Sequence, residues 1–506
     1  MSGAYRWLED RFRRLSDIDG AIAILSWDQA VWMPQGGAEA RARQLATLRR
    51  LAHELLTHPE VGERIEAAEG EAASLDDWQR ANLAAMRHRR LRAAAVDVRL
   101  VEQLAHATTR AEMVWREARA RDDFELLSPH LEEVFALVRE QAAQLAPALG
   151  LEPYDALLDG YQPGLTAAAI ERLFAPLERL LPDAIEDAMA RQREPLRPRG
   201  PFPPERQKAL FEELMRRLGF DFAHGRLDES AHPFCGGTPT DIRVTTRYDR
   251  SEFTSGLMAV LHETGHALYE AGLPRQWLGQ PVGEARGMAV HESQSLLVEM
   301  QLSRSGPFLR FLADQLAATF GPDPAFEAGN LQRLYHRVAR GFIRVDADEL
   351  TYPLHVILRY RLERALLAGG LAVADLPRAW REGMRDLLGV VPPNDRLGVL
   401  QDIHWPLGIV GYFPCYTVGA LLAAQLFQAA RAELPDLDEE TAAGRFDALL
   451  AWLRARVHRQ GSRWSFEELV RRASGRALEV TAFLRHLERR YGVLPGAGRM
   501  EAEAAS

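Results

Sequence analysis

Apolar residues recur at spacings of three and four along most of the chain, which predicts a protein built almost entirely from helices. The pattern is clearest over residues 4–150, where leucines at 45, 48, 51, 55 and 56 are separated by charged and polar residues. A stripe with this period occupies one face of an α-helix. The same spacing returns beyond residue 300, so we predict a mainly α fold.

Two stretches interrupt the helical pattern. Five prolines fall within residues 195–204, which indicates a surface loop or linker. It separates a helical N-terminal region, 1–194, from a region at 195–494, and we expect the two to form one continuous unit. Residues 241–248 alternate β-branched and polar side chains and predict a strand that could pair with an extended peptide. The tail at 495–506 is expected to be disordered.

Composition narrows the class of protein. Hydrophobic residues make up 47% and charged residues 26% of the 506 positions, which is typical of a globular protein. The net charge of -9 argues against a nucleic-acid partner, and the basic run at 87–92 is expected to be a solvated helix face. With only two cysteines, no disulfide framework is expected.

One segment is long and uncharged enough to be weighed as a membrane span. Residues 407–427 carry no charge, yet they include three glycines, a proline and three hydroxyl side chains. A buried loop and helix inside a large soluble enzyme fits this composition better, so no membrane partner is expected. The N-terminus lacks an apolar signal core, and we predict a cytoplasmic protein.

The strongest chemical signal is a pair of histidines four positions apart, His262 and His266, with Glu263 between them. Residues four apart share a helix face, so both imidazoles can reach one metal ion, and Glu263 can address a water beside it. The alternative is a pair of structural histidines on a half-buried helix. The apolar flanks and the flanking cap residues favour the metal site.

A catalytic zinc requires a third protein ligand and an open position. Downstream of the histidine pair, the candidates are Glu284, His291, Glu292 and Glu299. Glu292 is preferred because its distance from His266 allows a loop and an antiparallel return. The spacing alone leaves the other candidates open.

Several short motifs, in order along the chain, resemble those of the carboxypeptidase Taq family of zinc metallopeptidases. They are His-Pro-Phe at 232–234, Asp-Ile-Arg-Val-Thr at 241–245, His-Glu-Thr-Gly-His at 262–266, His-Glu-Ser-Gln at 291–294, Ile-Arg-Val-Asp-Ala-Asp at 343–348 and Gly-Val-Leu-Gln-Asp-Ile-His-Trp at 398–405. Stretches at 27–37 and 154–166 also resemble the family, so the likeness spans nearly the whole chain. It implies a two-lobed helical fold with a deep active-site groove, a small β-sheet near the metal helix, and a homodimer.

The resemblance also implies the catalytic centre. Zinc, for which cobalt can substitute, would be held by His262, His266 and Glu292. Zinc would lower the pKa of its bound water, and Glu263 would take the proton and pass it to the leaving amine. For the oxyanion, the resemblance to related helical zinc peptidases implies a histidine and a tyrosine. The candidates are His404 and Tyr416, with Tyr412 as the alternative tyrosine.

Two arginines within the motifs are candidates for binding a C-terminal carboxylate, because a guanidinium matches a carboxylate with paired hydrogen bonds. The resemblance implies that Arg243 and Arg344 face the groove and do this. For Arg344, the alternative is a structural ion pair with Asp346, Asp348 or Glu349.

Four further motif residues are expected to lie around the site without contacting the metal or the substrate. Asp348 and Asp241 are expected to orient metal ligands and arginines, and Asp348 could accept the second N–H of a metal-binding histidine. For His232 and His291, a structural role around the site is preferred to a direct role in catalysis.

The sequence therefore predicts a zinc metallocarboxypeptidase that releases single C-terminal residues from peptides. The family implies broad side-chain preference and poor action on C-terminal proline. An oligoendopeptidase or a dipeptidyl carboxypeptidase of similar helical fold is the alternative within the same chemistry. A catalytically inactive helical scaffold is the alternative outside it, and the intact set of His262, Glu263, His266 and Glu292 argues against it.

Overall fold

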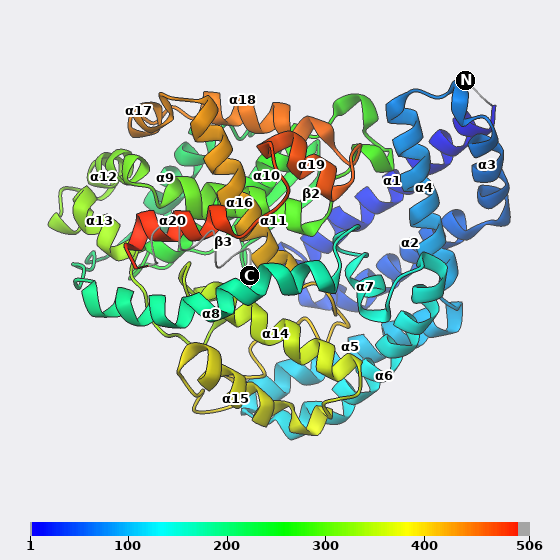
Figure 1. Cartoon of the computed structure of the whole chain (residues 1–506), viewed down its shortest axis with the longest axis horizontal. Helices are drawn as coiled ribbons and strands as arrows, with labels where there is room; N and C mark the ends of the chain where they lie inside the picture. The colour runs from blue at the N-terminus through cyan, green and yellow to red at the C-terminus, as the bar shows by residue number, and fades with distance from the viewer. Residues whose placement is uncertain (1–2, 494–506) are drawn as a thin grey trace.

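The computed structural model describes residues 3–493, and most of this length is helical, which confirms the predicted mainly α fold (Figure 1). The helices before the sheet are α1 (Gly3–Val31), α2 (Ala38–Thr57), α3 (Pro59–Gly70), α4 (Asp77–Ala95), α5 (Val98–Arg121), α6 (Phe124–Leu149), α7 (Pro153–Leu158), α8 (Ala167–Arg191) and α9 (Pro204–Arg217). Those after it are α10 (Thr254–Gly272), α11 (Met288–Leu296), α12 (Gly306–Phe320), α13 (Ala328–Tyr335), α14 (Tyr352–Leu367), α15 (Leu376–Leu388), α16 (Pro414–Glu433), α17 (Leu437–Ala442), α18 (Asp447–Arg456), α19 (Phe466–Ser474) and α20 (Thr481–Tyr491). The predicted disordered tail at 495–506 lies outside the described residues.

A three-stranded sheet precedes the central helices. It consists of β1 (Gly225–Glu229), β2 (Phe234–Thr238) and β3 (Asp241–Thr246) in the order β1-β3-β2, with β1 parallel and β2 antiparallel to β3. The predicted strand at 241–248 is therefore confirmed as β3. The expectation that it could pair with a peptide is wrong, because β1 and β2 occupy both of its edges. Within residues 3–493, the two edge strands of this sheet are β1 and β2.

The proline-rich segment is non-helical over 192–203, as its composition predicts. It does not divide the hydrophobic core, which includes residues from before, within and after it. Phe202 in this segment packs on Phe253 with ring centroids 4.8 Å apart. Helices α5 to α8 share one continuous core with the helices that follow the sheet. A second, smaller core is formed among α1 to α4, which lie together at one side of the molecule (Figure 1).

Helix α16 runs through the interior, beside α11 (Figure 1). Most of its residues are buried, so the uncharged stretch at 407–427 is a loop and a core helix, as predicted. No helix of the described chain combines the length and the apolar character that a membrane crossing requires.

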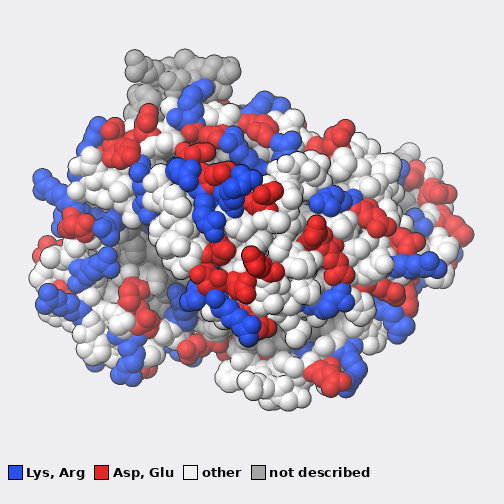
Figure 2. Space-filling view, turned by 90° about the horizontal axis from the view of Figure 1, so that it is seen from below, with Lys and Arg blue, Asp and Glu red and all other residues white. Residues whose placement is uncertain are grey.

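Basic and acidic side chains are interleaved over the face seen in Figure 2. The run at 87–92 is not the freely solvated helix face that the sequence suggests. Arg89 pairs with Asp19 and Glu284, and Arg92 pairs with Asp159. These basic side chains are half-buried, because they join α4 to neighbouring elements through ion pairs.

Candidate active site

The two histidines of the central motif lie on α10. This helix begins at Thr254, where the Glu252 carboxylate accepts hydrogen bonds from the backbone N–H groups of Thr254 and Ser255. Its apolar face is fully buried and includes Leu257 and Leu261. Because α10 is fixed on this side, His262 and His266 project together from the same face, one turn apart, with ring centroids separated by 5.0 Å.

The third member of the cluster comes from α11. The Glu292 Oε2 atom lies 3.4 Å from His266 Nε2 and 3.9 Å from His262 Nε2. One candidate ligand atom from each of the three residues can be chosen so that all lie within 4.8 Å of one another. The structure thus brings together the three residues predicted as metal ligands, with the nitrogens and the carboxylate oxygen facing a common point.

Two glycines allow these helices to approach closely. A methyl group at Gly265 would lie 2.4 Å from the Gln294 carbonyl oxygen and 2.6 Å from the Ser295 Cα atom. A methyl group at Gly419 on α16 would lie 2.8 Å from the Glu292 Cβ and Cγ atoms. Both distances are shorter than normal contacts, so glycine at these positions sets the separation of α10, α11 and α16.

We expect Gly265→Ala to lower the free energy of unfolding by about 1–3 kcal/mol, because the new methyl group would press on rigid backbone of α11. Urea unfolding followed by circular dichroism measures this. The matched control is Gly329→Ala in α13, where a methyl group meets nothing within 4 Å. Helix propensity predicts that this control is neutral or up to about 1 kcal/mol more stable. Equal stability of the two variants would contradict the packing argument.

The second nitrogen of each candidate ligand also has a partner. His262 Nδ1 lies 2.9 Å from Glu299 Oε2. His266 Nδ1 lies 2.6 Å from His291 Nδ1, and His291 Nε2 lies 2.8 Å from Glu270 Oε1. This arrangement leaves both Nε2 atoms free to bind a cation, and partners of this kind fix the orientation of metal-binding histidines.

Glu299 reaches His262 because the chain changes its helical winding. Residues Leu297–Ser303 form a π-helical segment directly after α11. Wider winding of this type alters which side chains share a face and often occurs at functional sites. Arg304 pairs with Glu299 from the end of the segment, which holds the carboxylate in place.

The charges in the cluster favour a bound cation. Although burial alone would lower it, the Glu292 carboxylate raises the pKa of His262 to about 10. Burial opposes ionisation of Glu292, but His262, His266 and Arg344 together outweigh it and lower the Glu292 pKa. The buried carboxylates therefore attract positive charge to this point, and a metal ion would supply it.

Glu263 is 8% exposed and lies beside the cluster without being part of it. Burial raises the pKa of Glu263 to about 7, and the charge of His262 opposes this rise. A carboxyl group with a pKa near neutrality can both accept and return a proton.

The segment before α16 contributes aromatic and imidazole groups. His404 Nε2 lies 3.1 Å from the Tyr416 hydroxyl oxygen, and burial lowers the His404 pKa to about 4, so the imidazole is neutral. The Tyr412 and Tyr416 rings are 5.2 Å apart. Burial raises the pKa of both hydroxyls, and the negative charge of Glu292 raises it further. The structure thus gathers all three predicted oxyanion-stabilising candidates on the Glu292 side of the site.

Arg344 lies beside these groups. Its guanidinium packs on the Tyr416 ring at 4.5 Å and interacts electrostatically with Glu292. Its ion-pair partner is Asp402, with Nη2 3.0 Å from Oδ1. The alternative partners Asp346, Asp348 and Glu349 suggested by the sequence are therefore wrong for this side chain, because Asp402 approaches from another segment.

Arg243 lies on a different face. Ile242 and Val244 are buried beneath α10, so strand alternation directs Arg243 to the opposite face of β3. There Asp241 holds it through two hydrogen bonds of 2.6 and 2.7 Å, and the guanidinium packs on Trp27 of α1 at 4.6 Å. Among the described residues, these contacts do not place Arg243 with the metal-ligand cluster.

Asp348 and His232 are also separate from the cluster. Asp348 accepts hydrogen bonds from the backbone N–H groups of Ala339, Leu350 and Thr351, which orders the loop before α14. The suggestion that it accepts from a metal-binding histidine is wrong, since Glu299 and His291 take those positions. His232 is exposed, and its backbone carbonyl accepts a hydrogen bond from Ser230.

Three residues around the site are not predicted from the sequence in the roles that the structure gives them. Glu270 lies one turn after His266, and that spacing could have indicated it. Asp402 lies inside the 398–405 motif but carries no assignment there. Glu299 is weighed only as a ligand, because the π-helical segment that turns it toward His262 has no visible signal in the sequence.

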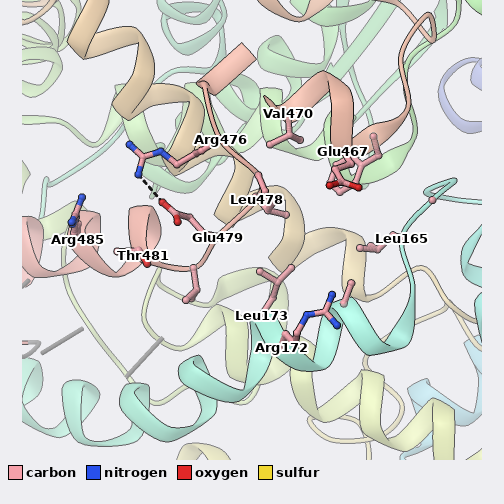
Figure 3. A pocket seen from close by; sticks show the side chains of 15 residues that line it. Leu165, Arg172, Leu173, Glu467, Val470, Arg476, Leu478, Glu479, Thr481 and Arg485 are labelled. Carbon is pink, nitrogen blue, oxygen red and sulfur yellow. Dashed lines mark hydrogen bonds and ion pairs between the residues drawn. The ribbon is translucent and has the colours of Figure 1, made fainter. Parts of the chain in front are cut away.

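A separate pocket of about 600 Å³ lies between α8, α19 and the start of α20 (Figure 3). Leu173 and Val470 contribute apolar surface to it, and Arg172 and Glu479 contribute charge. Its lining contains none of the residues of the candidate active site, so the chemistry described above does not use it.

A paired-histidine helix, a carboxylate from the following helix and a neighbouring glutamate in a large helical fold define a metallopeptidase. Comparison with known proteins agrees. The chain belongs to the carboxypeptidase Taq (M32) metallopeptidase family, whose profile matches residues 7–491, and it is a peptide hydrolase.

Curated relatives cover almost the full chain. The thermostable carboxypeptidase 1 of Thermus thermophilus is 42% identical over 97% of this chain and 99% of its own length. The carboxypeptidase 1 of Bacillus subtilis is 33% identical over 96% of this chain and 97% of its own length. These names describe carboxypeptidases and do not favour the endopeptidase alternative.

Solved structures share the fold. Metallocarboxypeptidase 1 of Trypanosoma cruzi has a TM-score of 0.95 and 41% identity, covering 96% of this chain and 99% of that one. Pyrococcus furiosus carboxypeptidase has a TM-score of 0.93 and 32% identity, covering 97% and 99%. The helical metallocarboxypeptidase fold is therefore shared over almost the whole length of the chain.

Proposed function

We propose that this metallocarboxypeptidase removes single residues from the C-terminal end of peptides, with broad side-chain preference and poor action on C-terminal proline. The observation that carries the proposal is the position of Arg344 beside the Tyr416 ring and the Glu292 side of the metal-ligand cluster. A guanidinium there is suited to a terminal carboxylate. The preferences for side chains and against proline come from the family.

The donor set fits a zinc ion, with cobalt as a substitute. Two imidazole nitrogens and one carboxylate oxygen converge, and the neighbouring residues leave the Nε2 atoms of His262 and His266 unblocked. When bound, such an ion polarises the scissile carbonyl group and lowers the pKa of a coordinated water.

Side chains of the protein are assigned proton transfer and stabilisation of the oxyanion. Glu263 holds the proton taken from the attacking water at its carboxylate and returns it to the leaving amine. Tyr416, or Tyr412 in its place, donates a hydrogen bond to the developing oxyanion, supported by His404. The burial of Glu263 and the hydrogen bond between His404 and Tyr416 support these assignments.

Of the two arginines, we assign recognition of the terminal carboxylate to Arg344 first. Arg243 remains proposed as a second carboxylate-binding group, but Asp241 and Trp27 hold it on the far face of β3. To reach substrate, it would have to exchange Asp241 for the substrate carboxylate. We further infer a homodimer, on the family resemblance alone, and a cytoplasmic location, which the low cysteine content supports.

The direct test is digestion of a defined peptide ladder followed by mass spectrometry. We expect stepwise loss of C-terminal residues, a stop at proline, and no cleavage after a metal chelator is added. Activity should return with zinc or cobalt. Internal cuts, or removal of residues in pairs, would instead support the oligoendopeptidase or dipeptidyl carboxypeptidase alternative.

Arg344→Gln is expected to reduce kcat/KM on free-ended peptides by about 10- to 100-fold, because a charge-assisted hydrogen bond to the substrate is lost. Hydrolysis of the same peptide with an amidated C-terminus should be unchanged. Steady-state kinetics on the matched peptides measures both values. If the variant changes the two substrates equally, Arg344 does not recognise the carboxylate.

A further inference from the structure

Two buried arginines share one carboxylate next to the candidate active site. Asp402 accepts from Arg344 at Oδ1, with Nε 3.2 Å and Nη2 3.0 Å away. Its other oxygen, Oδ2, accepts from Arg359 Nε at 2.6 Å. Two guanidinium groups and one carboxylate leave this trio with one excess positive charge.

Arg359 cannot touch substrate, since its side chain is 0% exposed. Its Nη1 group donates to the His355 carbonyl oxygen at 2.7 Å, and the guanidinium packs on the Trp380 ring at 4.5 Å. The side chain is therefore held by α14 behind it and by α15 across its face.

We propose that Arg359 is a positioning residue that acts through Asp402 to aim Arg344 at the C-terminal carboxylate of the substrate. By binding Oδ2, Arg359 fixes the plane of the Asp402 carboxylate. Oδ1 then holds the Nε and Nη2 side of Arg344. The Nη1 group of Arg344 makes no hydrogen bond within residues 3–493, which leaves it for the substrate.

The excess charge strengthens this arrangement. With Arg344 alone, Asp402 would neutralise the guanidinium and weaken its attraction for a second carboxylate. Because Arg359 shares Asp402, Arg344 keeps part of its charge for the substrate. The inference rests on the proposed recognition of the substrate carboxylate by Arg344 and extends it to a residue outside the sequence motifs.

The test is Arg359→Lys, which keeps the charge but loses the planar, multiple-donor geometry. We expect KM for a free-ended peptide to rise about 5- to 10-fold through misplacement of Arg344, with kcat within about twofold of the wild type. The rate on the amidated peptide should not change. The matched control is Arg361→Lys on the same helix, an exposed residue paired with Glu178, which should leave both constants unchanged.

A double-mutant cycle separates positioning from a general structural effect. In an Arg344→Gln background, Arg359→Lys should cause no further change in kcat/KM. Equal losses in both backgrounds, or no rise in KM in the single variant, would overturn the positioning role while leaving the proposed function intact. If the Arg344→Gln enzyme still prefers free-ended to amidated peptides as strongly as the wild type does, the proposed function fails, and the role of Arg359 fails with it.

A second variant tests the proposal if Arg359→Lys does not fold. Asp402→Asn removes the charge of the side chain that joins Arg359 to Arg344. It should therefore reproduce the selective rise in KM for free-ended peptides. Thermal unfolding curves show which variants are still folded at the assay temperature. A folded Asp402→Asn enzyme with unaltered KM would refute the proposal.

Discussion

Replacing Glu263 with glutamine is expected to lower kcat by about a thousandfold or more while the protein keeps its metal ion. Glutamine has nearly the same shape but cannot accept a proton at neutral pH, and loss of a general base costs about 10²- to 10⁴-fold. The side chain is only 8% exposed, so the substitution changes chemistry more than surface. Stopped-assay kinetics and metal analysis of the same preparation measure the two quantities.

The control for this experiment is Glu467→Gln, an exposed glutamate on α19 that pairs with Arg471. It should retain wild-type kcat and metal content. A Glu263→Gln enzyme with full activity would show that another group removes the proton. Loss of metal together with activity would place Glu263 among the ligands, a position that the geometry of the cluster does not give it.

Replacing Glu292 with glutamine is expected to abolish stable metal binding, and activity with it. One of three converging ligands would lose its charge, and the two imidazoles would face each other without the carboxylate between them. After dialysis, we expect less than about a tenth of an ion per chain, compared with one in the wild type. Elemental analysis by mass spectrometry gives the stoichiometry.

Glu284→Gln is the matched control, because the spacing of the sequence leaves Glu284 open as a third ligand. In the structure, its carboxylate pairs with Arg89 on α4 instead. The variant should bind metal and hydrolyse peptides normally. Metal loss from Glu284→Gln with retention by Glu292→Gln would reverse the assignment.

Local patterns are sufficient to predict much of the fold and part of the site. The three-and-four spacing of apolar residues predicts helices because one face must be buried, and the structure confirms the mainly α fold. The spacing of His262 and His266 requires that they share a face, since helix geometry alone fixes it. The strand at β3 is equally local, although its central place in the sheet is not.

Longer-range partners could not be predicted in this way. The sequence offers Asp346, Asp348 and Glu349 to Arg344 because they are its neighbours, yet the partner is Asp402, more than fifty residues away. Arg243 belongs to a motif, but strand alternation and the packing of α1 put it on the face away from α10. Such contacts depend on how separate helices dock, and no local spacing encodes that.

The sequence by itself determined the helical class, the paired histidines with Glu263 between them, and the family resemblance through its ordered motifs. Only the tertiary structure decided the partners of the other carboxylates: Glu299 supports His262, and Asp402 joins two arginines. The physical reason is that helix periodicity is set within a few residues. Ion pairs and close helix contacts, such as that at Gly419, are set by packing between distant segments.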